Sequence, residues 1–283
     1  MKVREALREG ERLLRGVSTD EAELEAELLL RHALSTDRVH LYQRLTEEIP
    51  PAAYKRYRKL LDRRLRHEPT AYLLRHREFF GLEFEVTPAA IIPRPETEVL
   101  VEMAIAFARE RFNDGPFDFA DIGVGCGAIA VSVARELPAA RVTAIDLSKR
   151  GLTLAWRNAC HHGVENRIRF LHGDLLAPLD APVDIIAANL PYVRTADWAS
   201  APMEIRWFEP RRGLDGGADG LRLIRRLLRQ APAFVRPKGA LFAEIGDGQA
   251  PGASALARAA FPEARIEVRP DLAGLDRVLC IYA

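Results

Sequence analysis

The residues best suited to chemistry form the tetrapeptide Asn189-Leu190-Pro191-Tyr192, which ends the apolar run VDIIAAN. The Asn189 side-chain oxygen and the backbone carbonyl of Leu190 can each accept one N–H of a planar amide or amine. The lone pair of such a nitrogen is conjugated, so catalysis would rest on positioning and electrostatics. We predict that Asn189 and Tyr192 are catalytic, and that all four residues bind a flat substrate group on which the Tyr192 ring stacks.

A glycine-rich loop is the second candidate for chemistry. Asp121-Ile122-Gly123-Val124-Gly125-Cys126-Gly127 joins an apolar run to a helical pattern, and its glycines allow a sharp turn and a close approach to a ligand. Asp146 lies 19 residues after Gly127, where a carboxylate can accept hydrogen bonds from ribose hydroxyls. Asp146 could instead cap the next helix. Loop and carboxylate together predict a nucleoside cofactor and fit both NAD and S-adenosylmethionine.

Further cofactor contacts are expected after the third strand, in the sequence HGDLL. Asp174 could accept a hydrogen bond from the adenine amine, or it could be a simple turn residue. The full set of expected cofactor contacts is Asp121, Gly123, Val124, Gly125, Cys126, Gly127, Asp146, Asp174, Leu175 and Asn189.

The tetrapeptide decides between the two cofactors. Ligands of open α/β sheets bind outside the carboxyl ends of the strands near a topological switch point, so the tetrapeptide should face the glycine loop. An Asn-x-Pro-aromatic loop suits methyl transfer to nitrogen, whereas no catalytic His or Tyr/Lys constellation accompanies the loop as a NAD dehydrogenase would require. We predict S-adenosylmethionine as the cofactor and S-adenosylhomocysteine as its product.

The secondary-structure elements that position these residues follow two kinds of sequence pattern. From about residue 116, strand and helix patterns alternate to the end of the chain, which predicts a Rossmann-like class I methyltransferase domain with a mostly parallel seven-stranded sheet. The first 70 or so residues have helical spacing, with a helix start at Ser18-Thr19-Asp20-Glu21 and a break at Pro50-Pro51. We expect a helical bundle domain over 1–75, a β-hairpin or linker over 76–92, and the methyltransferase domain over 93–283.

Composition excludes several classes of protein. The 283 residues carry a net charge of +1 and three scattered cysteines, so no disulfide framework, zinc site or other metal site is expected. The chain has neither a signal sequence nor an apolar run long enough for a membrane span, and we expect a cytoplasmic protein without membrane contact. Nine Lys/Arg fall between Lys55 and Arg77; they form either a solvated helix face or a surface for RNA or an acidic partner.

The chain resembles the HemK/PrmC family of release-factor glutamine methyltransferases over nearly its whole length. The resemblance rests on EPTAYLLRHREFFGLEFEVTPAAIIPRPETEVLVE, DIGVGCGAIA, NLPYV, EPRRGLDGGADGLRLIRRLL and LFAEIGDGQ. It implies S-adenosylmethionine as the methyl donor and, as the acceptor, the side-chain nitrogen (N5) of the glutamine in the GGQ motif of class I bacterial-type release factors. It also implies an N-terminal helical domain that grips the release factor. The family usually has proline where this chain has Leu190, which keeps the backbone carbonyl but loses the fixed φ.

Other functions stay open from the sequence alone. A ribosomal-protein glutamine methyltransferase would share the same loop, and an N6-adenine DNA methyltransferase would use a similar one. The near-zero net charge disfavours stable nucleic-acid binding, and the DNA enzyme is therefore the weaker alternative. A catalytically silent RNA or protein adaptor could use the basic run, but the intact Asp121, Asp146, Asn189 and Tyr192 argue against it. The sequence assigns no role to Arg94, Glu96 or Glu244.

Overall fold

The computed structural model describes residues 1–17 and 21–283, which fall into two compact units. The first unit comprises Met1–His76 together with Pro202–Phe208, and the second comprises Arg77–Ala201 and Glu209–Ala283. The helix start expected at Ser18-Thr19-Asp20 lies outside the described residues.

The first unit is helical. Its helices are α1 (Val3–Leu14), α2 (Ala22–Leu34), α3 (Arg38–Gln43), α4 (Pro51–Arg64) and α5 (Thr70–Leu74), joined by α9 (Met203–Phe208) from far along the chain. They enclose a buried apolar cluster that includes Leu29, Leu30, Tyr57 and Leu61. Helix α4 begins at Pro51, where the fixed φ of proline suits a first helical turn. A salt bridge of 3.1 Å between Arg64 and Glu204 holds α9 within this unit.

Three of the nine Lys/Arg between Lys55 and Arg77 form ion pairs within the first unit. The guanidinium of Arg58 pairs with Glu9, and Arg63 bonds to Glu68 through its Nε at 2.7 Å. Arg64 is almost fully buried and pairs with Glu25 at 2.9 Å. Glu9 and Glu25 lie outside the run and Glu68 lies within it. The other six Lys/Arg of the run are exposed, so most of its positive charge still faces solvent.

The second unit is built on a seven-stranded sheet with the order β10-β11-β9-β6-β3-β4-β5. The strands are β3 (Phe117–Ile122), β4 (Ala140–Asp146), β5 (Ile168–His172), β6 (Val183–Ala188), β9 (Val235–Glu244), β10 (Arg265–Pro270) and β11 (Asp276–Tyr282). Strand β11 is antiparallel to both of its neighbours, and the other pairings are parallel. The predicted mostly parallel seven-stranded sheet is confirmed.

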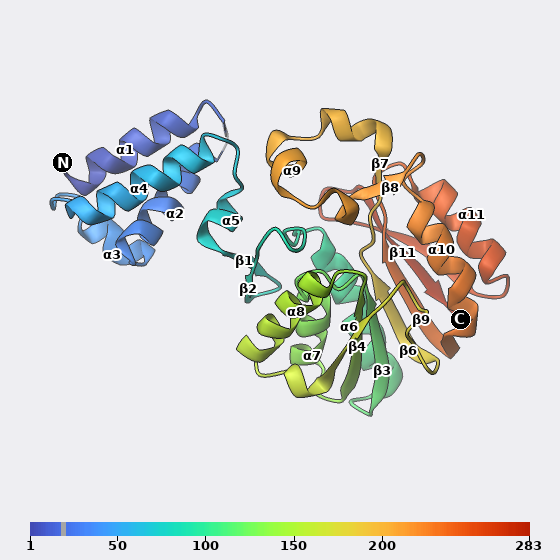
Figure 1. Ribbon diagram of the computed structural model, residues 1–283. Helices are drawn as coiled ribbons and strands as arrows, with labels where there is room; N and C mark the ends of the chain where they lie inside the picture. The colour runs from blue at the N-terminus through green and yellow to red at the C-terminus, as the bar shows by residue number, and fades with distance from the viewer. Residues whose placement is uncertain (18–20) are drawn as a thin grey trace. The chain divides into compact units, whose positions relative to one another are not determined.

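Helices cover both faces of this sheet (Figure 1). The helices α6 (Thr97–Phe112), α7 (Ala128–Glu136) and α8 (Lys149–His161) contribute to one buried cluster, and α10 (Arg222–Gln230) and α11 (Ala250–Ala260) contribute to another. The strands are apolar on both sides because both faces are buried. Helix α10 ends earlier than its pattern suggests and passes into the 3-10 turn Ala231–Ala233, since Pro232 has no N–H to continue the helix.

Smaller elements complete the second unit. Within the segment 76–92, for which the sequence predicts a β-hairpin or linker, β1 (His76–Phe79) and β2 (Leu82–Glu85) form a two-stranded sheet. Their turn has φ of 53° at Phe80 and 68° at Gly81, as tight hairpins require. The sequence did not predict the short parallel pair β7 (Val193–Arg194) and β8 (Asp215–Gly217). Further 3-10 turns are η1 (Glu165–Arg167), η2 (Thr195–Ser200) and η3 (Arg211–Gly213).

The strand order creates one switch point. Strands β3 and β6 are neighbours in the sheet; the chain leaves β3 toward β4 on one side and continues from β6 toward β9 on the other. Ile122 at the end of β3 pairs with Ala188 at the end of β6. The glycine loop and the tetrapeptide therefore begin side by side, as predicted.

Residues 1–17 and 21–283 contain neither a candidate membrane span nor a cluster of metal-ligating side chains. None of the helices there is long and apolar enough to cross a bilayer. Nor does this part of the chain bring together three or more His, Cys, Asp or Glu side chains that could hold a metal ion.

Candidate active site

The glycine loop has a backbone that only glycine adopts easily. Gly123, Gly125 and Gly127 have φ of 82°, 56° and 90°. A Cβ on Gly127 would lie 3.1 Å from the Cβ of Ala155, and one on Gly123 would lie 3.0 Å from a methyl group of Leu190. Conformation and space both require glycine at these positions, which brings the loop backbone to the cleft surface at Gly123 and Gly125.

Asp146 fixes this loop from the end of β4. Its Oδ2 accepts a hydrogen bond from the Gly125 N–H at 2.9 Å, and its Oδ1 accepts one from the Ser148 N–H at 2.6 Å. The capping role that the sequence allowed for Asp146 belongs to Ser148, whose Oγ accepts the Gly151 N–H at 3.0 Å at the start of α8. Each carboxylate oxygen of Asp146 keeps acceptor capacity for a ligand.

Asp121 supports the loop from the protein interior. It is fully buried, and its Oδ2 accepts the Ala130 N–H of α7 at 3.0 Å. Its Oδ1 has no hydrogen-bond partner among the described residues. Burial raises the pKa of the Asp121 carboxyl to about 7, with a smaller rise from the charge of Asp146 and an opposing effect of the Ala130 N–H. This residue acts on the loop and on α7 rather than on the cleft surface.

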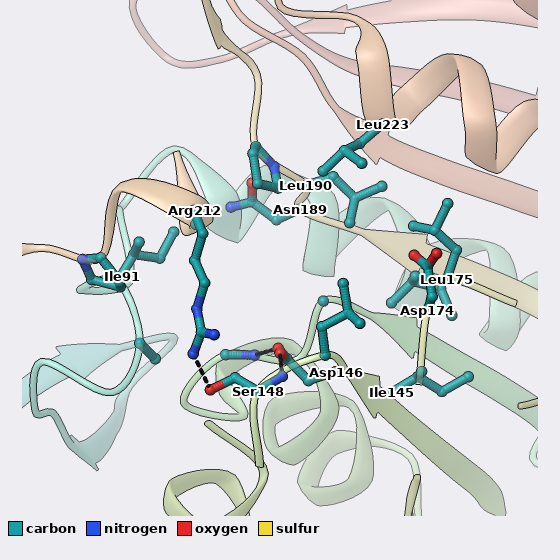
Figure 2. A pocket seen from close by; sticks show the side chains of 18 of the residues that line it. Ile91, Ile145, Asp146, Ser148, Asp174, Leu175, Asn189, Leu190, Arg212 and Leu223 are labelled. Carbon is teal, nitrogen blue, oxygen red and sulfur yellow. Dashed lines mark hydrogen bonds between the residues drawn. The ribbon is translucent and has the colours of Figure 1, made fainter. Parts of the chain in front are cut away.

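A cleft opens between the glycine loop and the tetrapeptide (Figure 2). Apolar side chains, among them Ile91, Ile145 and Leu223, form much of its wall. The expected cofactor contacts that line it are Gly123, Gly125, Asp146, Asp174, Leu175 and Asn189. The expected contacts that are buried and do not line it are Asp121, Val124, Cys126 and Gly127. The cleft thus has apolar walls and a few polar groups that converge on it, as small-molecule sites usually do.

Asp174 supplies one of these polar groups. Its carboxylate pairs with Arg226 of α10 through Oδ2. Its Oδ1 is inaccessible to solvent and has no hydrogen-bond partner within the described chain. The Asp174 side chain as a whole is 41% exposed and lines the cleft, where its carboxylate can meet a ligand amine.

Two segments that are far apart in the chain meet at the edge of the cleft. Glu209 accepts the Ile92 N–H at 3.1 Å and pairs with the guanidinium of Arg94. Arg212 lies three residues after Glu209 in the chain and donates to Ser148 Oγ at 2.7 Å across the cleft (Figure 2). The blocks IPRPETE and EPRRGLDGG are therefore joined in space. Sequence reasoning did not identify Glu209 or Arg212; the only signal was that both lie in blocks specific to the family.

The tetrapeptide stands where this cleft meets a second pocket of about 30 Å³. Asn189, Leu190 and Pro191 line both, whereas Tyr192 lines only the smaller one. Leu190 is 5% exposed and belongs to the buried apolar cluster of the α10 face. The four residues are thus brought together, and the smaller pocket gives them access to a second ligand.

Tyr192 makes contacts through its backbone carbonyl and through its buried hydroxyl. Its backbone carbonyl accepts the Gln249 Nε2–H at 2.8 Å. Burial raises the pKa of its hydroxyl above the usual value, and the neighbouring Glu244 carboxylate raises it further. The ring therefore stays neutral and cannot serve as a base, which agrees with a role in contact rather than in proton transfer.

Fold and site define the class of this protein: it is a class I methyltransferase, with the seven-stranded sheet, the glycine loop with Asp146, and the Asn189 loop at the switch point. Residues 119–207 match a methyltransferase domain family, and residues 5–74 match the PrmC N-terminal domain. The chain is 44% identical to the release factor glutamine methyltransferase of Moorella thermoacetica, over 100% of this chain and 99% of that protein. It belongs to the family of release factor glutamine methyltransferases.

Other relatives agree with this assignment. The release factor glutamine methyltransferase of Geobacter sulfurreducens is 40% identical over 92% of this chain and 89% of its own length. Among solved structures, a methyltransferase from Pyrococcus furiosus has a TM-score of 0.53 at 17% identity and covers 72% of this chain and 89% of its own. That similarity concerns the fold alone.

Proposed function

We propose that this protein transfers a methyl group from S-adenosylmethionine to the side-chain nitrogen of the GGQ glutamine of a peptide chain release factor. The names of the relatives at 44% and 40% identity support this acceptor. The observation that carries the proposal is the Asn189 amide, which stands where the two pockets meet. Its nitrogen donates to Thr97 Oγ1 at 2.9 Å, so its oxygen is left to accept a substrate N–H.

The cleft residues fit the cofactor by their chemistry. The Asp146 carboxylate would accept the ribose hydroxyls, and the Asp174 carboxylate would accept the adenine amine. Leu175 and the other apolar walls would contact the adenine ring, with Gly123 and Gly125 offering backbone to the amino-acid end. When bound, the cofactor supplies an electrophilic methyl group on a sulfonium. Asp121, Val124, Cys126 and Gly127 would act indirectly, by shaping the loop.

The tetrapeptide would hold the acceptor glutamine. Asn189 Oδ1 and the Leu190 carbonyl each accept one N–H of the glutamine amide, while Pro191 and the Tyr192 ring contact its flat face. The glutamine nitrogen forms the new N–C bond with its lone pair as the C–S bond breaks, and the bonding electrons go to sulfur. The two hydrogen bonds strengthen as positive charge grows on nitrogen, so they act mainly on the transition state. The proton then leaves the methylated nitrogen for water.

The helical domain over residues 1–75 would bind the release factor outside the catalytic cleft. Its match to the PrmC N-terminal domain over residues 5–74 supports this division of labour. A release-factor substrate also implies a cytoplasmic place of action. The near-zero net charge of the chain disfavours the alternative in which it binds nucleic acid.

The decisive experiment combines the purified protein, methyl-labelled S-adenosylmethionine and a purified release factor, followed by mass-spectrometric mapping of the label. The matched control is the same release factor with the GGQ glutamine changed to alanine. We expect one methyl group on that glutamine and none on the control. Parallel reactions contain ribosomal proteins or DNA in place of the release factor. Label in either of these, with an unlabelled release factor, would refute the proposal.

A further inference from the structure

A buried chain of three polar side chains stands behind the tetrapeptide. Asn189 Nδ2 donates to Thr97 Oγ1 at 2.9 Å, and Thr97 Oγ1 donates to Glu244 Oε2 at 2.6 Å. Thr97 begins α6, Glu244 ends β9, and Asn189 follows β6. Thr97 is 3% exposed and Glu244 is 0% exposed. Water therefore has no access to Glu244. Protein groups alone determine which of the three side chains donates and which accepts in each hydrogen bond.

The hydroxyl of Thr97 has one proton, which it donates in a hydrogen bond to Oε2 of Glu244; this direction holds as long as Oε2 itself is unprotonated. A distance of 2.6 Å is typical of a hydroxyl that donates to a carboxylate. The Thr97 oxygen is then only an acceptor toward Asn189, so it selects the NH₂ end of that amide. Asn189 must turn its oxygen the other way. Without Glu244 the hydroxyl could rotate and donate, and the amide could bind it through either end.

The direction of these hydrogen bonds matters because one end of the Asn189 side-chain amide is an acceptor and the other is a donor. The oxygen accepts a substrate N–H, whereas the NH₂ group would repel it. The two orientations have nearly the same shape, so packing cannot distinguish them. A donor–acceptor chain that ends in a buried carboxylate does distinguish them.

We propose that Thr97 and Glu244 are positioning residues that lock the Asn189 side chain with its oxygen toward the methyl acceptor. The inference rests on the proposed glutamine methylation for its kinetic effect, but the orientation itself does not depend on which acceptor is used. It assigns a function to the threonine of the IPRPETE block and to the glutamate of LFAEIG.

The surroundings of Glu244 agree with a role in holding an orientation. Its Oε1 makes no hydrogen bond of ordinary geometry with any described residue. Burial raises its pKa; Thr97, Tyr192 and Arg277 act in the opposite direction, and Glu96 adds to the rise. A buried carboxylate is costly for stability even with such partners, so a residue that served only packing would be better replaced by an apolar side chain of similar size.

The test uses matched substitutions in the full-length protein. Thr97→Val keeps the shape and removes the hydroxyl, Thr97→Ser keeps the hydroxyl, and Glu244→Met removes the carboxylate without leaving a large cavity. A misplaced catalytic group costs about 100-fold in rate, so kcat for release-factor methylation should fall about 10- to 100-fold in Thr97→Val and in Glu244→Met. Thr97→Ser should stay within about threefold of the wild type. KM and thermal unfolding of all three should change little, and Glu244→Met should be at least as stable as the wild type.

A second measurement needs no methyl acceptor. The side-chain NH₂ signals of Asn189, identified by NMR through their loss in Asn189→Ala, should be protected from water exchange in the wild type and in Thr97→Ser. They should lose that protection in Thr97→Val. If Thr97→Val turns over at the wild-type rate, or if Thr97→Ser is as slow as Thr97→Val, the positioning role is refuted. If the wild type methylates no release factor, the proposed function fails, and the NMR comparison still decides the orientation.

Discussion

Replacing Asp146 by alanine should weaken cofactor binding by one to two orders of magnitude. Hydrogen bonds to a charged group contribute about 1.5–3 kcal/mol, and about 1.4 kcal/mol corresponds to a factor of ten in affinity. The structure adds a complication, since the same carboxylate accepts the N–H groups of Gly125 and Ser148. Part of the loss would therefore come from a looser loop and not from the ribose.

A thermodynamic cycle separates the two contributions. Calorimetry would give the affinities of the wild type and of Asp146→Ala for S-adenosylhomocysteine and for its 2′-deoxy analogue. If Asp146 contacts the ribose, the deoxy analogue binds the wild type about tenfold less tightly, and this penalty disappears in the variant. An equal penalty in both proteins would show that Asp146 only supports the loop. Unchanged affinity of Asp146→Ala for S-adenosylhomocysteine would refute the assignment of the cleft to the cofactor.

Three further results are expected. Asn189→Ala should lower kcat about 10²- to 10³-fold, as loss of one preorganised group at a reacting centre does, with little change in the far-ultraviolet circular dichroism; turnover near the wild-type value would remove the main support for the function. The raised pKa of Asp121 means that the native state keeps a proton which the unfolded chain loses, so its contribution to stability should fall as pH rises from 3.8 to about 7 and stay level above that. Urea denaturation across this range should show a smaller fall in Asp121→Asn, and identical slopes would show that the carboxyl titrates normally. Deletion of residues 1–75 should leave calorimetric cofactor affinity unchanged and sharply reduce methylation of a whole release factor; a truncated protein that is folded and fully active would show that the helical domain has another role.

The elements of the second unit were predictable because their signals are local. The apolar runs that become β3, β4 and β6 are buried on both faces, and the helix patterns between them require crossover connections. The alternation fixes a parallel sheet, and the sheet fixes where the strand ends meet. For that reason Asp146 and Asn189, which end β4 and β6, could be placed at one cleft from the sequence.

Within the glycine-loop motif, the sequence did not show which residues reach the cleft surface. The seven consecutive residues from Asp121 to Gly127 look equivalent as a motif, yet only Gly123 and Gly125 among the expected contacts reach the cleft surface. Asp121 is turned inward to Ala130. A tight turn points successive side chains in different directions, and the direction follows from backbone angles that the glycine spacing does not specify.

The sequence by itself determined the class of fold, the chemistry of the cleft and, through its resemblance, the family. Only the tertiary structure decided which distant side chains meet. Thr97 and Glu244 are separated by 147 residues, and Arg94 and Glu209 by 115. Such contacts leave no periodic or local signal, because they depend on strand order, helix placement and the return path of the chain. The orientation of the Asn189 amide is therefore a property of the folded molecule, although the asparagine itself is visible in the sequence.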